Sequence, residues 1–330
     1  EVRAWQQSIA IDEGDPDCFT KRLYLYRDLY RKYWSLPDVR QVMANIPQYM
    51  IWDDHEITNG WGSEETHKGQ PHQTIFQVAR KAYTEFQHSH NPQNLSQPDT
   101  LYYGFHIGCT SFLFLDLRGH RQIWNRQILG QAQRDWITQF IQNECQTSKV
   151  LFVISSVPMF HLDPRWTWIP ASDVSDQWSD EHNKMDRKWL LDRLFGWLQE
   201  GKNRQVFILG GDVHVGTFAE ARVKGSDLKI VQATSSPISN KLASLWDVFL
   251  KKVSSTFSIT TESGKTVDVS IERRYPVRNF LVVTVDNTSD PVAPIIRFRM
   301  HWEGKKNPDP YPGEIGSGRL IDWLRKGRFK

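Results

Sequence analysis

The sequence is short of cysteine, of net charge and of long apolar runs. Only Cys18, Cys109 and Cys145 are cysteines among 330 residues; their spacing fits no metal site and leaves one unpaired in any disulfide scheme, which favours a reducing compartment. The formal net charge of +3 is too small for a dedicated nucleic-acid surface. No apolar run approaches the roughly 18 residues of a membrane span, so we expect none.

Common catalytic motifs are absent as well. His55-Glu56 is not followed by the second histidine of a zinc-peptidase helix, and no Gly-x-Ser-x-Gly sequence occurs. Residues 196–202 imitate a phosphate-binding loop, but Asn203 stands where Ser or Thr is needed, and the segment ends a predicted helix instead of starting one. Zinc-peptidase and serine-hydrolase chemistry are therefore excluded, and the loop match is accidental.

The composition and the periodicity are those of a layered α/β protein. Hydrophobic residues make up 39% and charged residues 24%. Strands alternating with helices predict an α/β core that becomes more antiparallel toward the C-terminus. We expect one domain over residues 1–330, with the Gly- and Pro-rich segment 305–318 at its periphery. The predicted helices are 19–34, 37–45, 71–88, 130–145 and 184–200, and the predicted strands are 48–52, 101–107, 110–115, 150–155, 205–209, 228–233, 280–285 and 295–302.

Two polar groups directly follow predicted buried strands. The first is DDHE at 53–56 and the second is GGDVH at 210–214. Adjacent carboxylates are costly to bury unless a cation or hydrogen bonds compensate them, so a shared metal site is the simplest interpretation. One residue separates Asp212 from His214, which places both side chains on one side of an extended chain. The alternatives are a capped helix start for the first group and a turn with a core histidine for the second.

A long tryptophan-rich loop is predicted between the strand at 150–155 and the helix at 184–200. Loops of this length without secondary structure are often functional. Trp166, Trp168 and Trp178 in this loop are candidates for the wall of a substrate pocket.

The segments IWDDHEITNGWG (51–62) and LGGDVHVG (209–216) together resemble the PhoD-like alkaline phosphatases, a branch of the calcineurin-like metallophosphoesterase superfamily. LDLRGHR (115–121), the lead-in YRKYWSLPDVRQVMANIP (30–47) and the late strand RNFLVV (278–283) are similar to that family in the same order. The resemblance implies a sandwich of two β-sheets flanked by helices and hydrolysis of phosphate esters at a dinuclear metal centre, with monoesters as the expected substrates.

By this resemblance Asp54, Asp212 and His214 are metal ligands, and His55 is the general acid that protonates the leaving alkoxide. The family's chemistry implies two cations about 3.5–4 Å apart. Carboxylates in place of neutral ligands suit calcium, manganese or ferric iron better than an all-imidazole zinc site, and the identity of the ions stays open among calcium, manganese, iron and zinc.

Four further residues are expected to support this centre. Asp53 stands at a glycine position of the superfamily motif, and Glu56 is placed to orient His55 or to support the ligands from a second layer. Arg118, and after it Arg121, is a candidate to bind the substrate phosphate with its planar guanidinium.

The two opening metal motifs of the superfamily have no convincing counterpart, and Gly14-Asp15-Pro16-Asp17 is one residue short of the pattern. We therefore expect an N-terminally incomplete sandwich whose carboxylates bind cations weakly and have raised pKa values without them. The cysteines favour a cytoplasmic location, while a removed export signal stays open because the sequence begins at Glu1.

Two other functions remain open on the sequence alone. The same centre would cleave phosphodiesters if its pocket admitted a second substituent. A non-catalytic module that has lost part of the metal site could instead engage nucleic acid through aromatic loops and the basic tail 325–330, although the small net charge makes nucleic acid an unlikely partner. A small or polymeric phosphate ester is the expected partner; the sequence does not set the oligomeric state.

Overall fold

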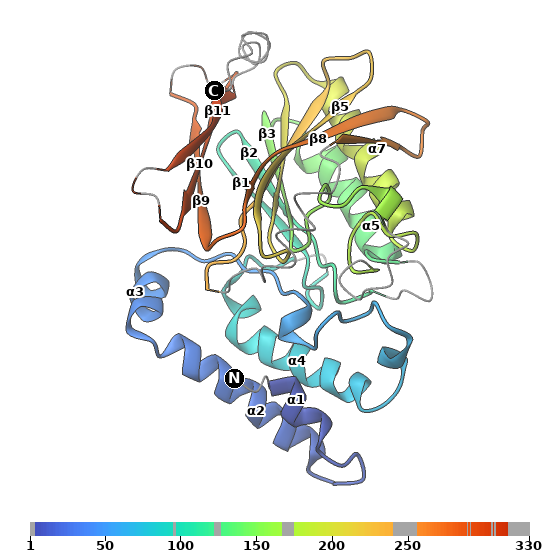
Figure 1. Cartoon of the computed structure of the whole chain (residues 1–330), viewed down its shortest axis with the longest axis vertical. Helices are drawn as coiled ribbons and strands as arrows, with labels where there is room; N and C mark the ends of the chain where they lie inside the picture. The colour runs from blue at the N-terminus through green and yellow to red at the C-terminus, as the bar shows by residue number, and fades with distance from the viewer. Residues whose placement is uncertain are drawn as a thin grey trace.

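The computed structural model describes residues 4–94, 97–121, 127–166, 175–239, 256–288, 290, 292–304, 306 and 308–315. Two β-sheets pack face to face, helices cover the other face of the larger sheet, and a layer of N-terminal helices lies across one end of the sheets (Figure 1). The two-sheet α/β sandwich predicted from the sequence is confirmed. No helix in the described ranges has both the length and the apolar character needed to cross a bilayer.

The larger sheet has the strand order β1-β2-β3-β4-β6-β5-β8-β7. β2, β3, β4 and β6 run parallel to one another, and the other neighbours pair antiparallel. Because parallel strands end at a common edge, the loops that follow these four strands lie together. The strands are β1 (Tyr103–Ile107), β2 (Thr110–Phe114), β3 (Val150–Ser155), β4 (Gln205–Gly210), β5 (Gly216–Val223), β6 (Lys229–Thr234), β7 (Thr256–Thr260) and β8 (Thr266–Tyr275).

The smaller sheet is antiparallel, in the order β11-β10-β9, and packs against the larger one. Its strands are β9 (Asn279–Asp286), β10 (Ile295–Trp302) and β11 (Asp309–Ile315). Phe298 of β10 is buried, and its ring lies 5.3 Å from that of Phe207 in β4. A shared apolar layer of side chains from both sheets holds them together: Val150, Phe152, Phe207, Phe218, Val231, Ala233, Tyr275, Ile296, Phe298 and Met300.

Successive residues of the central strands face opposite layers. In β3, Phe152 faces the small sheet, while Leu151 and Val153 belong to the cluster beneath the helices. These helices are α5 (Gln131–Gln139), which continues into the π-helical turn η5 (Phe140–Glu144), and α7 (Lys184–Glu200). Burial on both faces stabilises each such side chain by roughly 1.5–3 kcal/mol, which explains why the parallel strands read as continuous apolar runs.

The N-terminal layer has an apolar cluster of its own, built on α1 (Ala4–Ile9), α2 (Cys18–Trp34) and α4 (His72–Phe86). Trp52 and Trp61 belong to this cluster and flank the predicted DDHE group. The layer therefore holds the first polar group against the end of the sheets. Its short elements are α3 (Pro37–Asn45), η1 (Asp54–Glu56), η2 (Glu65–Lys68) and η3 (His88–His90), and a further single turn, η6 (Pro164–Trp166), follows β3.

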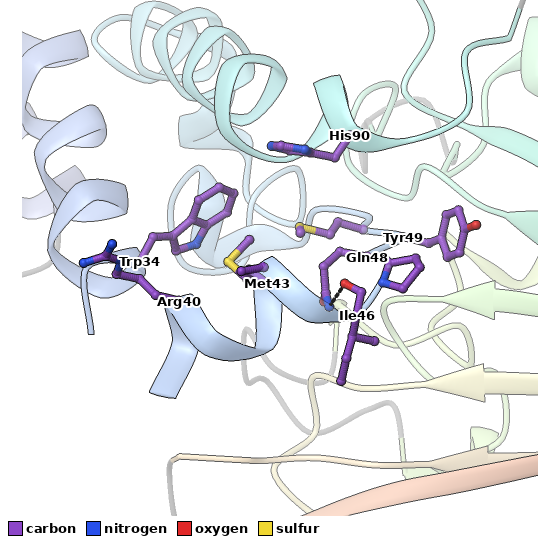
Figure 2. A pocket seen from close by; sticks show the side chains of 10 residues that line it. Trp34, Arg40, Met43, Ile46, Gln48, Tyr49 and His90 are labelled. Carbon is purple, nitrogen blue, oxygen red and sulfur yellow. Dashed lines mark hydrogen bonds between the residues drawn. The ribbon is translucent and has the colours of Figure 1, made fainter. Parts of the chain in front are cut away.

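Helix α3 buries none of its residues. Beside it lies a hollow of about 600 Å³, between α3, the end of α2 and the chain that follows. Figure 2 shows Trp34, Arg40 and Met43 on one side of this hollow, and Tyr49 and His90 on the others.

The strand predicted at 48–52 is wrong, because within the described residues this segment belongs to neither sheet. Side chains replace the missing ladder. The Met50 N–H donates to Asn91 Oδ1 at 2.8 Å, and the Met50 carbonyl accepts bonds from Asn91 Nδ2 at 2.6 Å and from the Tyr83 and Tyr103 hydroxyls at 3.0 Å each. Side-chain hydrogen bonds can therefore satisfy the Met50 backbone outside a sheet, and in this segment only Trp52 is buried.

Four strands are not among those predicted: β5, β7, β8 and β11. In β8, buried Val267 and Val269 alternate with exposed Asp268, so polar residues on the other face hide the strand from an apolar-run criterion. β11 lies within 305–318, where only a peripheral segment was expected, and it pairs with β10 at an edge of the small sheet.

Candidate metal centre

The loops after the parallel strands converge with the first polar group. Arg118 follows β2, Ser156 follows β3 and Asp212 follows β4. Ser156 donates its hydroxyl to Asp53 Oδ1 at 2.9 Å, and Arg118 donates Nε to the same oxygen at 2.6 Å. These contacts tie the N-terminal segment to the carboxyl edge of the sheet.

Three carboxylates meet at this edge. Asp53, Asp54 and Asp212 each offer an oxygen, and these atoms all lie within 4.8 Å of one another. Asp54 is buried and accepts the Gly60 N–H at 2.6 Å. Among the described residues this group does not include His214, whose backbone N–H donates to Ser236 Oγ at 3.2 Å. The two polar groups of the sequence thus meet through their carboxylates.

The extended conformation expected for residues 212–214 is wrong. Asp212 has φ +62° and His214 has φ +55°, both in the left-handed region, which costs roughly 1–2 kcal/mol for each residue with a side chain. The turn is held by hydrogen bonds: Gly211 N–H donates to the Ser156 carbonyl at 3.0 Å, and Val213 N–H donates to the Gly211 carbonyl at 2.8 Å. Backbone strain of this kind concentrates at functional sites.

The helix cap considered as an alternative for the DDHE segment is present, and it coexists with the three-carboxylate group. Asp53 caps η1: its N–H donates to Glu56 Oε2 at 2.8 Å, and its side chain accepts the Glu56 N–H. Asp53 therefore orders the turn and also belongs to the three-carboxylate group. A capping role does not exclude a metal-binding one.

The His55 ring lies beside Asn59 and Asp54. Its Nε2 is 3.2 Å from Asn59 Oδ1 and 3.7 Å from Asp54 Oδ2. Glu56 accepts from the Asp53 N–H and from Gln87 Nε2 at 3.2 Å, so it holds the backbone of a candidate ligand, and its role in orienting His55 stays a prediction. Burial, with the Asp53 charge adding to it, raises the pKa of Glu56 to about 7. Asn59, which the sequence analysis did not single out, is the neighbour of the candidate acid.

Arg118 is fully buried between two carboxylates. Besides Asp53, it binds Asp176, through Nη1 to Oδ1 at 2.6 Å and Nη2 to Oδ2 at 2.8 Å. Arg121 Nη2 donates to the carbonyls of Ser175 and Asp176 at 3.0 Å each, while its buried Nε and Nη1 have no hydrogen-bond partner within the described ranges. Phosphate binding by the two arginines stays a prediction, since here the donors of Arg118 serve carboxylates.

Asp176 is the functional candidate that sequence reasoning missed. It is buried in the tryptophan-rich loop, and the only signal was the length of that loop. Trp178 does not wall a pocket: it is buried and donates Nε1 to the Val157 carbonyl at 3.1 Å. Trp168 lies outside the described residues, as does the placement of the Trp166 side chain.

The charges of the centre are unbalanced. When all four carboxylates are ionised, Asp53, Asp54, Asp176 and Asp212 carry two more negative charges than Arg118 and Arg121 carry positive ones. Burial, and then the charge of Asp53, holds the pKa of Asp212 well above its usual range. Burial also raises the pKa of Asp53 despite Arg118. The pKa of Asp176 is lowered, because the two guanidiniums outweigh its burial.

A divalent cation fits this arrangement. The donors are hard carboxylate oxygens, and a first M²⁺ ion would match the two excess negative charges of the ionised group. Such an ion would also favour the charged form of Asp212 and so reverse the shift of its pKa.

Comparison with known proteins agrees with the resemblance seen in the sequence. A family model described as PhoD-like phosphatase matches residues 2–258. Alkaline phosphatase D of Bacillus subtilis (strain 168) is 25% identical over 221 residues, which cover 57% of this chain and 34% of that protein. The chain thus spans about a third of the length of this curated relative. Because the family model covers well over half of the sequence, the chain belongs to the PhoD-like phosphatase family.

Proposed function

We propose that this chain forms the metal centre of a phosphoric ester hydrolase that acts on phosphate monoesters in the manner of alkaline phosphatase D. One observation carries the proposal: Asp53, Asp54 and Asp212, from segments far apart in the sequence, present oxygens within 4.8 Å of one another at the carboxyl edge of a parallel sheet. Membership of the PhoD-like family supplies the class of reaction.

The ligands we propose are Asp54 and Asp212, with His214 two residues further along the same strained turn. Asp53 lies close enough to share in the coordination. We propose two cations, with calcium, manganese or ferric iron favoured by the carboxylate donors. When bound, they activate water as a nucleophile and polarise the phosphoryl oxygens.

We propose His55 as the general acid. Its side chain is 40% exposed, so it can reach a leaving group, and its Nε2 lies 3.7 Å from Asp54 Oδ2 at the edge of the carboxylate group. Asn59 Oδ1, 3.2 Å from Nε2, orients the imidazole. We also propose Arg118 and Arg121 as phosphate ligands. In that role some of their N–H donors would bind the substrate phosphate in place of Asp176.

Substitution of the carboxylates tests the proposal. We expect Asp54→Asn and Asp212→Asn each to weaken Mn²⁺ binding in calorimetry and to lower turnover of p-nitrophenyl phosphate by 100-fold or more, since each removes a hard ligand. Asp192→Asn is a matched control, because this carboxylate binds Ser263 and Lys265 away from the centre.

Three results would change the proposal. Faster cleavage of bis(p-nitrophenyl) phosphate than of the monoester would favour the phosphodiesterase alternative. Turnover that survives chelation would contradict a metal-dependent reaction. Single-stranded nucleic acid binding without any metal response would favour the non-catalytic module.

A further inference from the structure

We propose that Asp176 is a positioning residue of the metal centre: it fixes Arg118, and Arg118 fixes Asp53 beside Asp54 and Asp212. This inference rests on the proposed function, because it assigns a role within that centre. It concerns a side chain in a loop that the sequence motifs do not touch.

Arg118 is the bridge between the loop and the ligands. Its Nε and Nη2 lie 2.6 Å and 2.5 Å from Asp53 Oδ1. Its Nη1 and Nη2 form a bidentate ion pair with the two carboxylate oxygens of Asp176. A bidentate ion pair fixes the plane of the guanidinium as well as its position. The Arg118 side chain is fully buried, so water does not compete for these donors.

Asp176 can act as an anchor because its own backbone is held on both sides. Asn183 Nδ2 donates to the carbonyls of residues 175 and 177 at 3.0 Å and 2.8 Å. Trp178, 1% exposed, donates Nε1 to Ser155 Oγ at the end of β3 at 3.2 Å. Arg121 Nη2 donates to the Asp176 carbonyl at 3.0 Å. The loop is therefore fastened to the same sheet edge as the ligands.

Sharing Arg118 between two carboxylates also leaves negative charge for a cation. With Asp176 present, the guanidinium neutralises Asp53 only in part, and the cluster keeps its two excess negative charges. Without the Asp176 charge, Arg118 would pair with Asp53 alone and the excess would fall to one. Both changes weaken the attraction for a divalent cation.

The test compares Asp176→Asn, Asp176→Glu and the control Asp192→Asn by calorimetry with Mn²⁺ alone and by near-ultraviolet circular dichroism. Loss of a residue that orients a metal ligand typically weakens metal affinity by about 10–100-fold. We expect that loss for Asp176→Asn with a native dichroism spectrum, partial recovery for Asp176→Glu, and wild-type affinity for Asp192→Asn. In turnover assays with Mn²⁺, we expect the loss to be relieved by raising the metal concentration.

Mn²⁺ affinity unchanged in Asp176→Asn, or lowered equally in Asp192→Asn, would overturn the positioning role. If Asp176→Asn does not fold, Trp178→Phe keeps the charge but removes the indole hydrogen bonds that fasten the loop; we expect it to weaken Mn²⁺ binding several-fold, and unchanged affinity would overturn the proposal. Failure of the proposed function is distinguishable: the wild-type chain would then bind no Mn²⁺ or Ca²⁺, and Asp54→Asn would change nothing.

Discussion

At the scale of single residues, the centre depends on side chains that have more than one partner. Asp53 caps a helical turn, accepts from Ser156 and Arg118, and stands beside two further carboxylates. Asp116 also has several partners: its Oδ1 accepts hydrogen bonds from Trp52 Nε1 at 2.6 Å and from the backbone N–H of Arg118 at 3.0 Å. Changing one such residue therefore alters both local order and the charge of the site.

His67 provides a prediction on pH dependence. Burial, with a smaller effect of His72, lowers the pKa of the His67 imidazole to about 4. The unfolded chain, with a pKa near 6.5, binds more protons between these values, so the stability that neutral His67 contributes is complete above pH 6.5 and is lost as the pH falls toward 4. Lowering the pH from 7.5 to 5.5 should cost about 1 kcal/mol through this residue.

The measurement is urea unfolding at both pH values in the presence of a chelator. His67 Nδ1 accepts the Gly62 N–H at 3.1 Å, and His67→Asn keeps an acceptor there without a titrating group. We expect the variant to lose less stability than the wild type over this interval, and equal losses would contradict the assignment.

At the scale of elements, the segment before the DDHE group shows that an apolar sequence need not form a strand. It is apolar and short, as a strand would be, yet the N–H and the carbonyl of Met50 are bonded by the side chains of Asn91, Tyr83 and Tyr103. Freed from a ladder, the chain can turn directly into η1 and bring Asp53 to the sheet edge.

Asn91 is therefore expected to matter for both stability and the site. Asn91→Ala removes two hydrogen bonds to Met50 and takes away the acceptor of the part-buried Met50 N–H, while the Met50 carbonyl keeps the Tyr83 and Tyr103 hydroxyls; the expected cost is about 1–3 kcal/mol in the free energy of unfolding. Asn45→Ala, which removes one exposed hydrogen bond at the end of α3, is the control and should change stability by less than about 0.5 kcal/mol. Chemical denaturation measures the free energy of unfolding of both variants. Similar losses of stability would contradict a particular role for the Asn91–Met50 hydrogen bonds.

At the scale of the whole molecule, the site lies where the N-terminal helical layer meets the carboxyl edge of the larger sheet. The parallel strands bring Arg118, Ser156 and Asp212 to one edge, and the N-terminal helices supply Asp53 and Asp54. A bound cation would then link the helical layer to the sheets, so metal binding and global stability should be coupled.

Thermal unfolding with and without metal measures that coupling. Free Mn²⁺ at 100 times its dissociation constant should stabilise the folded chain by about 2.7 kcal/mol, visible as a rise in Tm that a chelator reverses. Asp212→Asn should abolish the rise, while Asp192→Asn should keep it. A rise of the same size in Asp212→Asn would place the ion elsewhere.

Much of the fold follows from local pattern. The helices at 184–200 and 37–45 and the strand at 150–155 were predicted at their observed limits, because strong periodicity or a continuous apolar run marks them. β8 and the segment at 48–52 were misjudged because their structure depends on which neighbour covers or bonds them. The prediction of a single domain remains a prediction.

The sequence by itself determined the family, the two-sheet α/β class and the two polar groups, since these rest on motifs, composition and short-range periodicity. Only the tertiary structure decided that Arg118 lies between Asp53 and Asp176, that Asn59 Oδ1 lies beside the His55 ring, and that Asp212 and His214 adopt left-handed conformations. The reason is physical. The partner of a side chain depends on the strand order and loop packing that bring distant segments of the chain together, and local sequence patterns do not specify these long-range contacts.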